Sequence, residues 1–208
     1  MAVDYALYLV TDRAILGDRD LLTAVEQALQ GGVTMLQLRE KTASSRDFYQ
    51  LAVKMRELAA AYQVPLIIND RLDIALAADA GGLHVGQDDL PITVARRILG
   101  PGKILGYSVS TVEEAVYGEQ NGADYLGAGP VYATGSKDDA GRPIGIDVLR
   151  RIKQGVAIPV VGIGGIGEVN ILDVKRAGAD GASVISAIMG SGDPKRAAGA
   201  LAAAWRQS

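Results

Sequence analysis

The sequence of 208 residues contains no cysteine and only one histidine. The lack of cysteine excludes disulfide bonds, thiolate nucleophiles and cysteine-ligated metal centres. The single histidine, His84, has no second histidine with which to form a zinc site. Cysteine chemistry and histidine-based zinc chemistry are therefore not expected.

Long apolar runs and basic clusters are also missing. No stretch approaches the roughly 18 apolar residues needed to span a bilayer. Residues 1–12 lack the basic start and long apolar segment of a secretory signal. We therefore expect a soluble, cytoplasmic protein without a membrane partner. The 21 Lys and Arg against 24 Asp and Glu give a net charge of −3, so nucleic acid is not an expected partner either.

What the sequence does contain is a regular alternation of short apolar runs and amphipathic stretches, the pattern of repeated β/α units. The runs are nearly continuously apolar, as expected for parallel strands covered on both faces. They predict eight strands, at residues 6–11, 35–39, 66–69, 83–86, 104–108, 125–129, 160–163 and 182–185. Eight units without a linker predict an α/β fold, a single-domain (βα)8 TIM barrel over residues 1–208, near the lower size limit of roughly 200 residues.

Helical spacing and glycines define the segments between these strands. Apolar residues recur with the helical period in residues 21–29 and 48–62. Glycine suits the left-handed position after a helix, and we expect helix ends at Gly31-Gly32, Gly81-Gly82, Gly122 and Gly178.

In such a barrel the chemistry is found at the carboxyl ends of the strands. After the second strand, Gln37, Arg39 and Lys41 alternate along one side, while Glu40 points to the other. Two cations at a barrel mouth suit a diphosphate. The alternative is a salt-bridged strand end with solvated charges.

Carboxylates follow the third and fourth strands, in Asn69-Asp70 and Asp88-Asp89. Mg²⁺ commonly uses one or two carboxylates together with phosphate oxygens and water, so a metal–diphosphate site is one interpretation. The other is that Asp70 and Asp88 are helix N-caps, a frequent role of Asp.

Three further features allow a functional and a structural interpretation. His84 is either a catalytic imidazole or, as we favour, a packed histidine with satisfied ring nitrogens. The glycine-rich residues 162–166 form either a phosphate site with Ser186 or a tight turn. Residues 134–143 predict a long mobile loop, either a functional lid or an ordinary surface loop.

Together these segments resemble thiamine phosphate synthases over nearly the whole chain. The resemblance is carried by ordered motifs: Tyr8-Leu-Val-Thr-Asp12, Gln37-Leu-Arg-Glu-Lys41, Ile68-Asn-Asp-Arg71, Leu83-His-Val-Gly-Gln-Asp-Asp89, Gly129-Pro-Val-Tyr132, Thr134-Gly-Ser-Lys137 and Gly162-Ile-Gly-Gly-Ile166. The family often has threonine where this chain has Ser136, and a hydroxyl is kept.

The resemblance implies a transferase that joins an aminopyrimidine diphosphate to a thiazole phosphate, in the methyl or the carboxylated form, and releases thiamine phosphate and pyrophosphate. The aminopyrimidine diphosphate would be held by Gln37, Leu38, Arg39, Glu40, Lys41, Asn69, Ser108 and Lys137, of which Arg39, Ser108 and Lys137 would serve catalysis. Mg²⁺ would be held by Asp70 and Asp89. The thiazole phosphate would be held by Thr134, Gly135, Ser136, Gly165, Ile185 and Ser186.

The mechanism implied by the family is dissociative and needs no protein nucleophile. Rival functions are a thiazole tautomerase of the same superfamily, a sugar-phosphate isomerase or epimerase, and a non-catalytic thiazole-phosphate binding protein. The metal–diphosphate residues favour the synthase over the tautomerase. A homo-oligomer is compatible with the sequence, which does not define the number of subunits.

Overall fold

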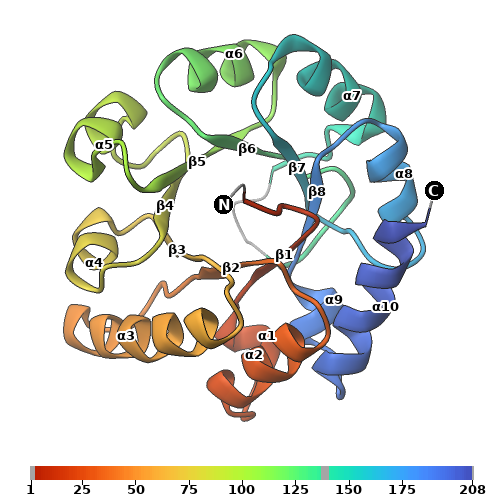
Figure 1. Cartoon of the computed structure of the whole chain (residues 1–208). Coiled ribbons are helices and arrows are strands. Elements are labelled where there is room, and N and C mark those ends of the chain that lie inside the picture. Colours follow the sequence, from red (N-terminus) through yellow and green to blue (C-terminus); the bar gives the residue numbers. More distant parts are fainter. Residues whose placement is uncertain (1–2, 137–140, 208) are drawn as a thin grey trace.

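The computed structural model describes residues 3–136 and 141–207. Its parallel strands form a closed barrel in sequence order, and β8 pairs with β1 to complete the ring. The strands surround the centre and the helices form the outer layer (Figure 1). The predicted TIM barrel is confirmed. The strands are β1 (Leu7–Val10), β2 (Met35–Leu38), β3 (Leu66–Asn69), β4 (Gly82–Val85), β5 (Ile104–Val109), β6 (Tyr125–Ala128), β7 (Val160–Ile163) and β8 (Gly181–Val184).

Most longer helices begin at a polar residue whose side chain satisfies a free backbone N–H. Ser44 accepts from the first turn of α3 and Asp20 from that of α2, while Thr111 and Glu114 form a reciprocal capping box at α6. The helices are α1 (Arg13–Leu16), α2 (Leu21–Gln30), α3 (Ser45–Ala61), α4 (Leu72–Ala77), α5 (Ile92–Leu99), α6 (Val112–Gln120), α7 (Gly145–Gly155), α8 (Ile171–Arg176), α9 (Ser186–Met189) and α10 (Pro194–Arg206).

Glycine ends helices at three of the four predicted places. Gly32, Gly122 and Gly178 have φ values of 104°, 99° and 92°. The prediction for Gly81-Gly82 is wrong, because Asp79 adopts the left-handed conformation after α4, with φ 51°. Gly82 instead lies within β4, where a Cβ atom would strike the backbone of β5.

Successive side chains of each strand face opposite sides of the barrel wall. In β1, Leu7 and Leu9 pack in the layer between barrel and helices, whereas Tyr8 and Val10 fill the interior. The segment before β1 lies across the centre of the barrel in Figure 1. Its Tyr5 packs on Tyr125, with ring centroids 5.2 Å apart. The interior is therefore a packed core that begins at the amino-terminal ends of the strands.

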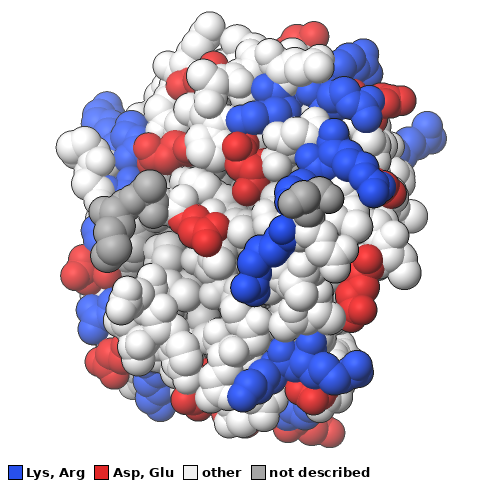
Figure 2. All heavy atoms as spheres, turned by 45° about the vertical axis from the view of Figure 1, so that its right-hand side comes forward, with Lys and Arg blue, Asp and Glu red and all other residues white. Residues whose placement is uncertain are grey.

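The surface shows no extended field of one sign on the face drawn in Figure 2, where Lys and Arg side chains lie beside Asp and Glu side chains. Within residues 3–136 and 141–207, no helix has the length and hydropathy to cross a membrane.

Candidate active site

A cavity of about 530 Å³ opens at the carboxyl ends of the strands. Its walls come from the loops that follow β2 to β8, so residues far apart in the sequence meet around one space. The predicted site residues that line it are Arg39, Lys41, Asn69, Asp70, Asp89, Ser108, Thr134, Ser136, Gly165, Ile185 and Ser186.

Three predicted residues of the Gln37–Lys41 segment face elsewhere. Leu38 is fully buried in the layer between barrel and helices. Glu40, two residues beyond the end of β2, is not among the cavity-lining residues and accepts a hydrogen bond of 2.6 Å from Arg13 Nε. Gln37 is buried in the barrel and donates through Nε2 to the Tyr8 hydroxyl at 2.6 Å. Leu38 and Glu40 thus lie behind the cavity wall, whereas Gln37 lines a smaller cavity of about 20 Å³ that shares His84 and Ser108 with the main one.

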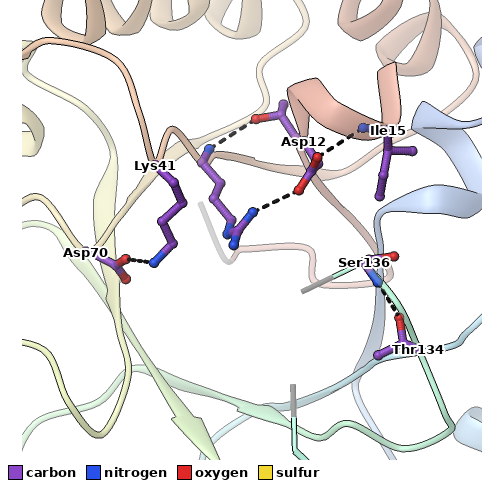
Figure 3. A network of polar contacts seen from close by, with 8 residues as sticks. Asp12, Ile15, Lys41, Asp70, Thr134 and Ser136 are labelled. Carbon is purple, nitrogen blue, oxygen red and sulfur yellow. Dashed lines mark hydrogen bonds and ion pairs between the residues drawn. The ribbon is translucent and has the colours of Figure 1, made fainter. Parts of the chain in front are cut away.

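Arg39 is held at the cavity by an acidic residue that sequence reasoning left without a role. Its Nη1 lies 2.8 Å from Oδ2 of Asp12, in an ion pair whose side chains are 13% and 9% exposed. The other oxygen of Asp12 accepts from Ile15 N at 3.1 Å and caps α1, as Figure 3 shows. Because Asp12 is itself fixed by the helix, it fixes the guanidinium.

Asp70 and Asp89 lie next to one another at the ends of β3 and β4. Asp70 adopts a left-handed φ of 61°, and its N–H donates to His84 O at 2.9 Å. Its Oδ2 accepts from Lys41 Nζ at 2.7 Å (Figure 3). Oδ2 of Asp89 accepts from Gly86 N at 2.7 Å.

The two carboxyl groups are coupled electrostatically. Burial raises the pKa of Asp89, and the adjacent Asp70 raises it further. Burial also acts to raise the pKa of Asp70, but its hydrogen bond and charge interaction with Lys41 help bring the pKa below the ordinary value. Asp70 is thus the ionised member of the pair, and the ammonium group of Lys41 compensates its charge.

The helix-cap interpretation of the carboxylates is wrong. The N-cap of α4 is Arg71 and that of α5 is Pro91, and neither makes a side-chain capping bond. Asp88 is exposed. Neither Asp70 nor Asp88 is therefore the N-cap of the helix that follows it.

A hard cation fits this donor set. Two carboxylates and nearby space for phosphate oxygens and water meet the usual requirements of Mg²⁺. Across the described part of the chain, no cluster of three or more His, Cys, Asp or Glu residues could form a complete protein cage. The arrangement suits a metal that is shared with a phosphorylated ligand.

The glycine-rich turn after β7 forms the opposite wall. Gly164 and Gly165 have left-handed φ values of 97° and 64°. A Cβ atom at Gly165 would strike Tyr132 and the carbonyl oxygen of Ala133. Tyr132 N also donates to Gly164 O at 3.0 Å. The turn therefore needs glycine for its own packing, and it brings backbone to the cavity beside Ser186.

The loop after β6 supplies two hydroxyls to this wall. Ser136 N donates to Thr134 Oγ1 at 3.2 Å, and the two residues lie together in Figure 3. Gly135, between them, is exposed. Lys137 lies outside the described residues, so its predicted place beside the diphosphate stays a prediction.

His84 lies between the cavity and the barrel interior. Its Nδ1 is 2.8 Å from the hydroxyl of Tyr125, and its Nε2 is 2.8 Å from Oγ of Ser108. Both ring nitrogens are thus satisfied, as the packed interpretation of His84 predicts. Sequence reasoning missed its partner Tyr125 and the next residue in the network, Tyr8. The period-two alternation of the strands, applied to all eight, would have placed both on the inner face.

Comparisons with known proteins agree with this geometry. Residues 7–188 match the family model described as thiamine monophosphate synthase. The chain is 62% identical over 206 residues to a thiamine-phosphate synthase of Desulfitobacterium hafniense (strain DSM 10664 / DCB-2), covering 99% of this chain and 100% of that one. It is 53% identical over 205 residues to one from Syntrophomonas wolfei subsp. wolfei, covering 99% and 98%.

Solved structures add a match in three dimensions. A thiamine phosphate pyrophosphorylase from Pyrococcus furiosus superposes with a TM-score of 0.90 at 41% identity, covering 98% of this chain and 96% of that one. A 3-hexulose-6-phosphate synthase superposes with a TM-score of 0.71 at 18% identity, which shows a shared fold alone.

Proposed function

The chain belongs to the thiamine monophosphate synthase family and shares its transferase activity, and from this premise we propose how the cavity joins an aminopyrimidine diphosphate to a thiazole phosphate. The observation that carries the proposal is that two unlike walls face one space. One wall has cations beside paired carboxylates, and the other has glycine backbone beside hydroxyls. A metal–diphosphate suits the first wall, and a phosphate monoester suits the second.

The aminopyrimidine diphosphate binds at the first wall. Arg39, oriented by Asp12, and Lys41 neutralise diphosphate oxygens, while Asn69 and Ser108 supply polar contacts at the inner end of the cavity. Lys137 adds a further cation from the β6 loop. Leu38 and Glu40 act from behind the wall, by holding the β2 end in place, and Gln37 lies deeper, at the small cavity that it shares with Ser108.

The thiazole phosphate binds at the second wall. Backbone at Gly165 and Ile185 approaches its phosphate, and the hydroxyls of Thr134, Ser136 and Ser186 donate to the oxygens. Gly135 allows the turn between the two loop hydroxyls. The thiazole nitrogen then faces the pyrimidine methylene across the cavity.

The reaction proceeds by dissociation. The bond between the pyrimidine methylene carbon and the diphosphate oxygen breaks, and pyrophosphate leaves with the electron pair. The thiazole nitrogen uses its lone pair to form the new carbon–nitrogen bond, so no protein nucleophile is needed. Arg39 and Lys41 stabilise the charge that grows on the leaving group.

Asp70 and Asp89 would hold Mg²⁺, which when bound neutralises charge on the leaving diphosphate. In this arrangement Lys41 pairs with Asp70 at 2.7 Å and also lines the cavity in which the diphosphate would lie.

The test is a reaction of purified protein with both substrates and Mg²⁺, in which pyrophosphate and thiamine phosphate are measured together. We expect equal amounts of the two products and none when either substrate is omitted. A tautomerase would convert thiazole phosphate alone, and a binding protein would bind it without release of pyrophosphate. Either result would contradict the proposal.

A further inference from the structure

A continuous chain of hydrogen bonds runs through the barrel interior and ends at the cavity. Gln37 Nε2 donates to the Tyr8 hydroxyl at 2.6 Å, and that hydroxyl lies 2.8 Å from the hydroxyl of Tyr125. Tyr125 is 2.8 Å from His84 Nδ1, and His84 Nε2 is 2.8 Å from Ser108 Oγ. Ser108 and His84 line the cavity, whereas both tyrosines are almost completely buried.

The first donor sets the direction of the whole chain. The direction that uses every proton once begins at Gln37: the Tyr8 oxygen accepts from Gln37 Nε2, and Tyr8 donates to Tyr125. In that direction Tyr125 donates its own proton to His84 Nδ1. A neutral imidazole that accepts at Nδ1 carries its proton on Nε2, which donates to Ser108.

The surroundings keep these protons in place. Burial raises the pKa of Tyr8 and that of Tyr125 well above the ordinary value of tyrosine, so both hydroxyls stay protonated. Glycine also makes room for the chain. A Cβ atom at Gly106 would fall on the Tyr125 ring and on His84 Nδ1, and one at Gly127 would lie 3.1 Å from His84 Cε1.

Resting on the proposed function, we propose that His84 is a positioning residue: the chain fixes its Nε2–H tautomer, so that Ser108 accepts from His84 and directs its own proton to an acceptor atom of the aminopyrimidine diphosphate. In this role His84 transfers no proton during the reaction. Tyr8 and Tyr125 then contribute to substrate binding without touching the substrate.

The decisive measurement is the tautomer of His84. As the chain has one histidine, a long-range ¹H–¹⁵N correlation spectrum of the labelled protein contains one imidazole. We expect the neutral imidazole to give a single form, protonated at Nε2. A neutral imidazole protonated at Nδ1, or an even mixture of the two tautomers, would overturn the proposal.

A second measurement tests the relay from a distance. Tyr125→Phe removes the donor to Nδ1, and we expect both tautomers to appear and kcat to fall about tenfold, with an unchanged KM for thiazole phosphate. Tyr5→Phe is the matched control, because Tyr5 packs on the same ring and its hydroxyl makes no hydrogen bond with the described residues. An unchanged tautomer and kcat in Tyr125→Phe would overturn the relay.

Two substitutions of His84 test the direction of the hydrogen-bond chain from Gln37 to Ser108. Gln can place an amide N–H near the position of Nε2, whereas Asn places its amide near Nδ1. We expect His84→Gln to retain more kcat than His84→Asn, and the reverse order would refute the direction of the chain. Wild-type protein that forms no thiamine phosphate would refute the proposed function while leaving the tautomer result intact.

Discussion

Replacing each carboxylate of the Asp70–Asp89 pair by asparagine should have opposite effects on the metal-free protein. Asparagine at 89 keeps an oxygen that can accept from Gly86, and asparagine at 70 tolerates the left-handed φ of 61°. Both substitutions thereby conserve the backbone conformation and the local hydrogen bonds, so a change in stability reports the loss of the carboxylate charge.

The sign follows from the pKa directions. The pKa of Asp89 is raised in the folded state, so its protonated form stabilises the fold and that contribution is lost as pH rises through the folded pKa. At neutral pH, Asp89→Asn should therefore leave the melting temperature in chelator unchanged or higher. The pKa of Asp70 is lowered, so its ionised form contributes stability that is lost as pH falls through the folded pKa.

The expected magnitude for Asp70→Asn is limited by solvent. Its pair with Lys41 has side-chain exposures of 23% and 48%, and such pairs contribute up to about 1 kcal/mol. For a domain of this size that corresponds to a fall in melting temperature of roughly 2–4 °C. Thermal unfolding in chelator at pH 7.5 measures both variants.

Turnover should respond in the same direction for both variants. A metal at a leaving phosphate supplies several kcal/mol, and each 1.4 kcal/mol is about tenfold in rate, so we expect losses on the order of 10²- to 10³-fold. Turnover is measured against Mg²⁺ concentration. Near-normal rates in both variants, full wild-type activity in chelator, or a destabilised Asp89→Asn in chelator would refute the reasoning.

Three further predictions concern the cavity walls. Asp12→Asn keeps the α1 cap but loses the charge that orients Arg39. It should raise the KM for the aminopyrimidine diphosphate about tenfold in steady-state assays, which corresponds to about 1.4 kcal/mol of binding free energy, and an unchanged KM would count against the orienting role. Ser186→Ala should raise the KM for thiazole phosphate several-fold without changing that for the diphosphate, and an equal effect on both would argue against separate walls. Lys137→Ala should lower kcat strongly at an unchanged melting temperature, whereas a large loss of stability with normal turnover would reject a role at the diphosphate.

The sequence predicted the barrel well because each strand carries its own signal. Parallel strands covered on both faces are apolar throughout, and the predicted runs agree with β1 to β8 to within one residue at either end. The error at Gly81-Gly82 arose because a strand glycine that admits a neighbouring backbone looks, in sequence, like a helix end.

The site was less accessible, since its contacts join distant segments. Alternation placed Glu40 opposite Arg39 and Lys41, but it could not show that Asp12 holds Arg39 across 27 positions of sequence. The motif around Gln37 suggested contact with ligand, and that contact stays a prediction; the motif could not show that the side chain also donates to Tyr8. Such pairings depend on which strand ends the barrel brings together.

The segment before β1 closes the amino-terminal end of the barrel, where Tyr5 packs on Tyr125. Tyr5 and the core above it fill the barrel from the end opposite the cavity. Substrates and products would then share one opening among the described residues. Pyrophosphate that remains at the diphosphate wall would prevent the next aminopyrimidine diphosphate from binding. Steady-state kinetics should therefore show pyrophosphate as an inhibitor that competes with the aminopyrimidine diphosphate.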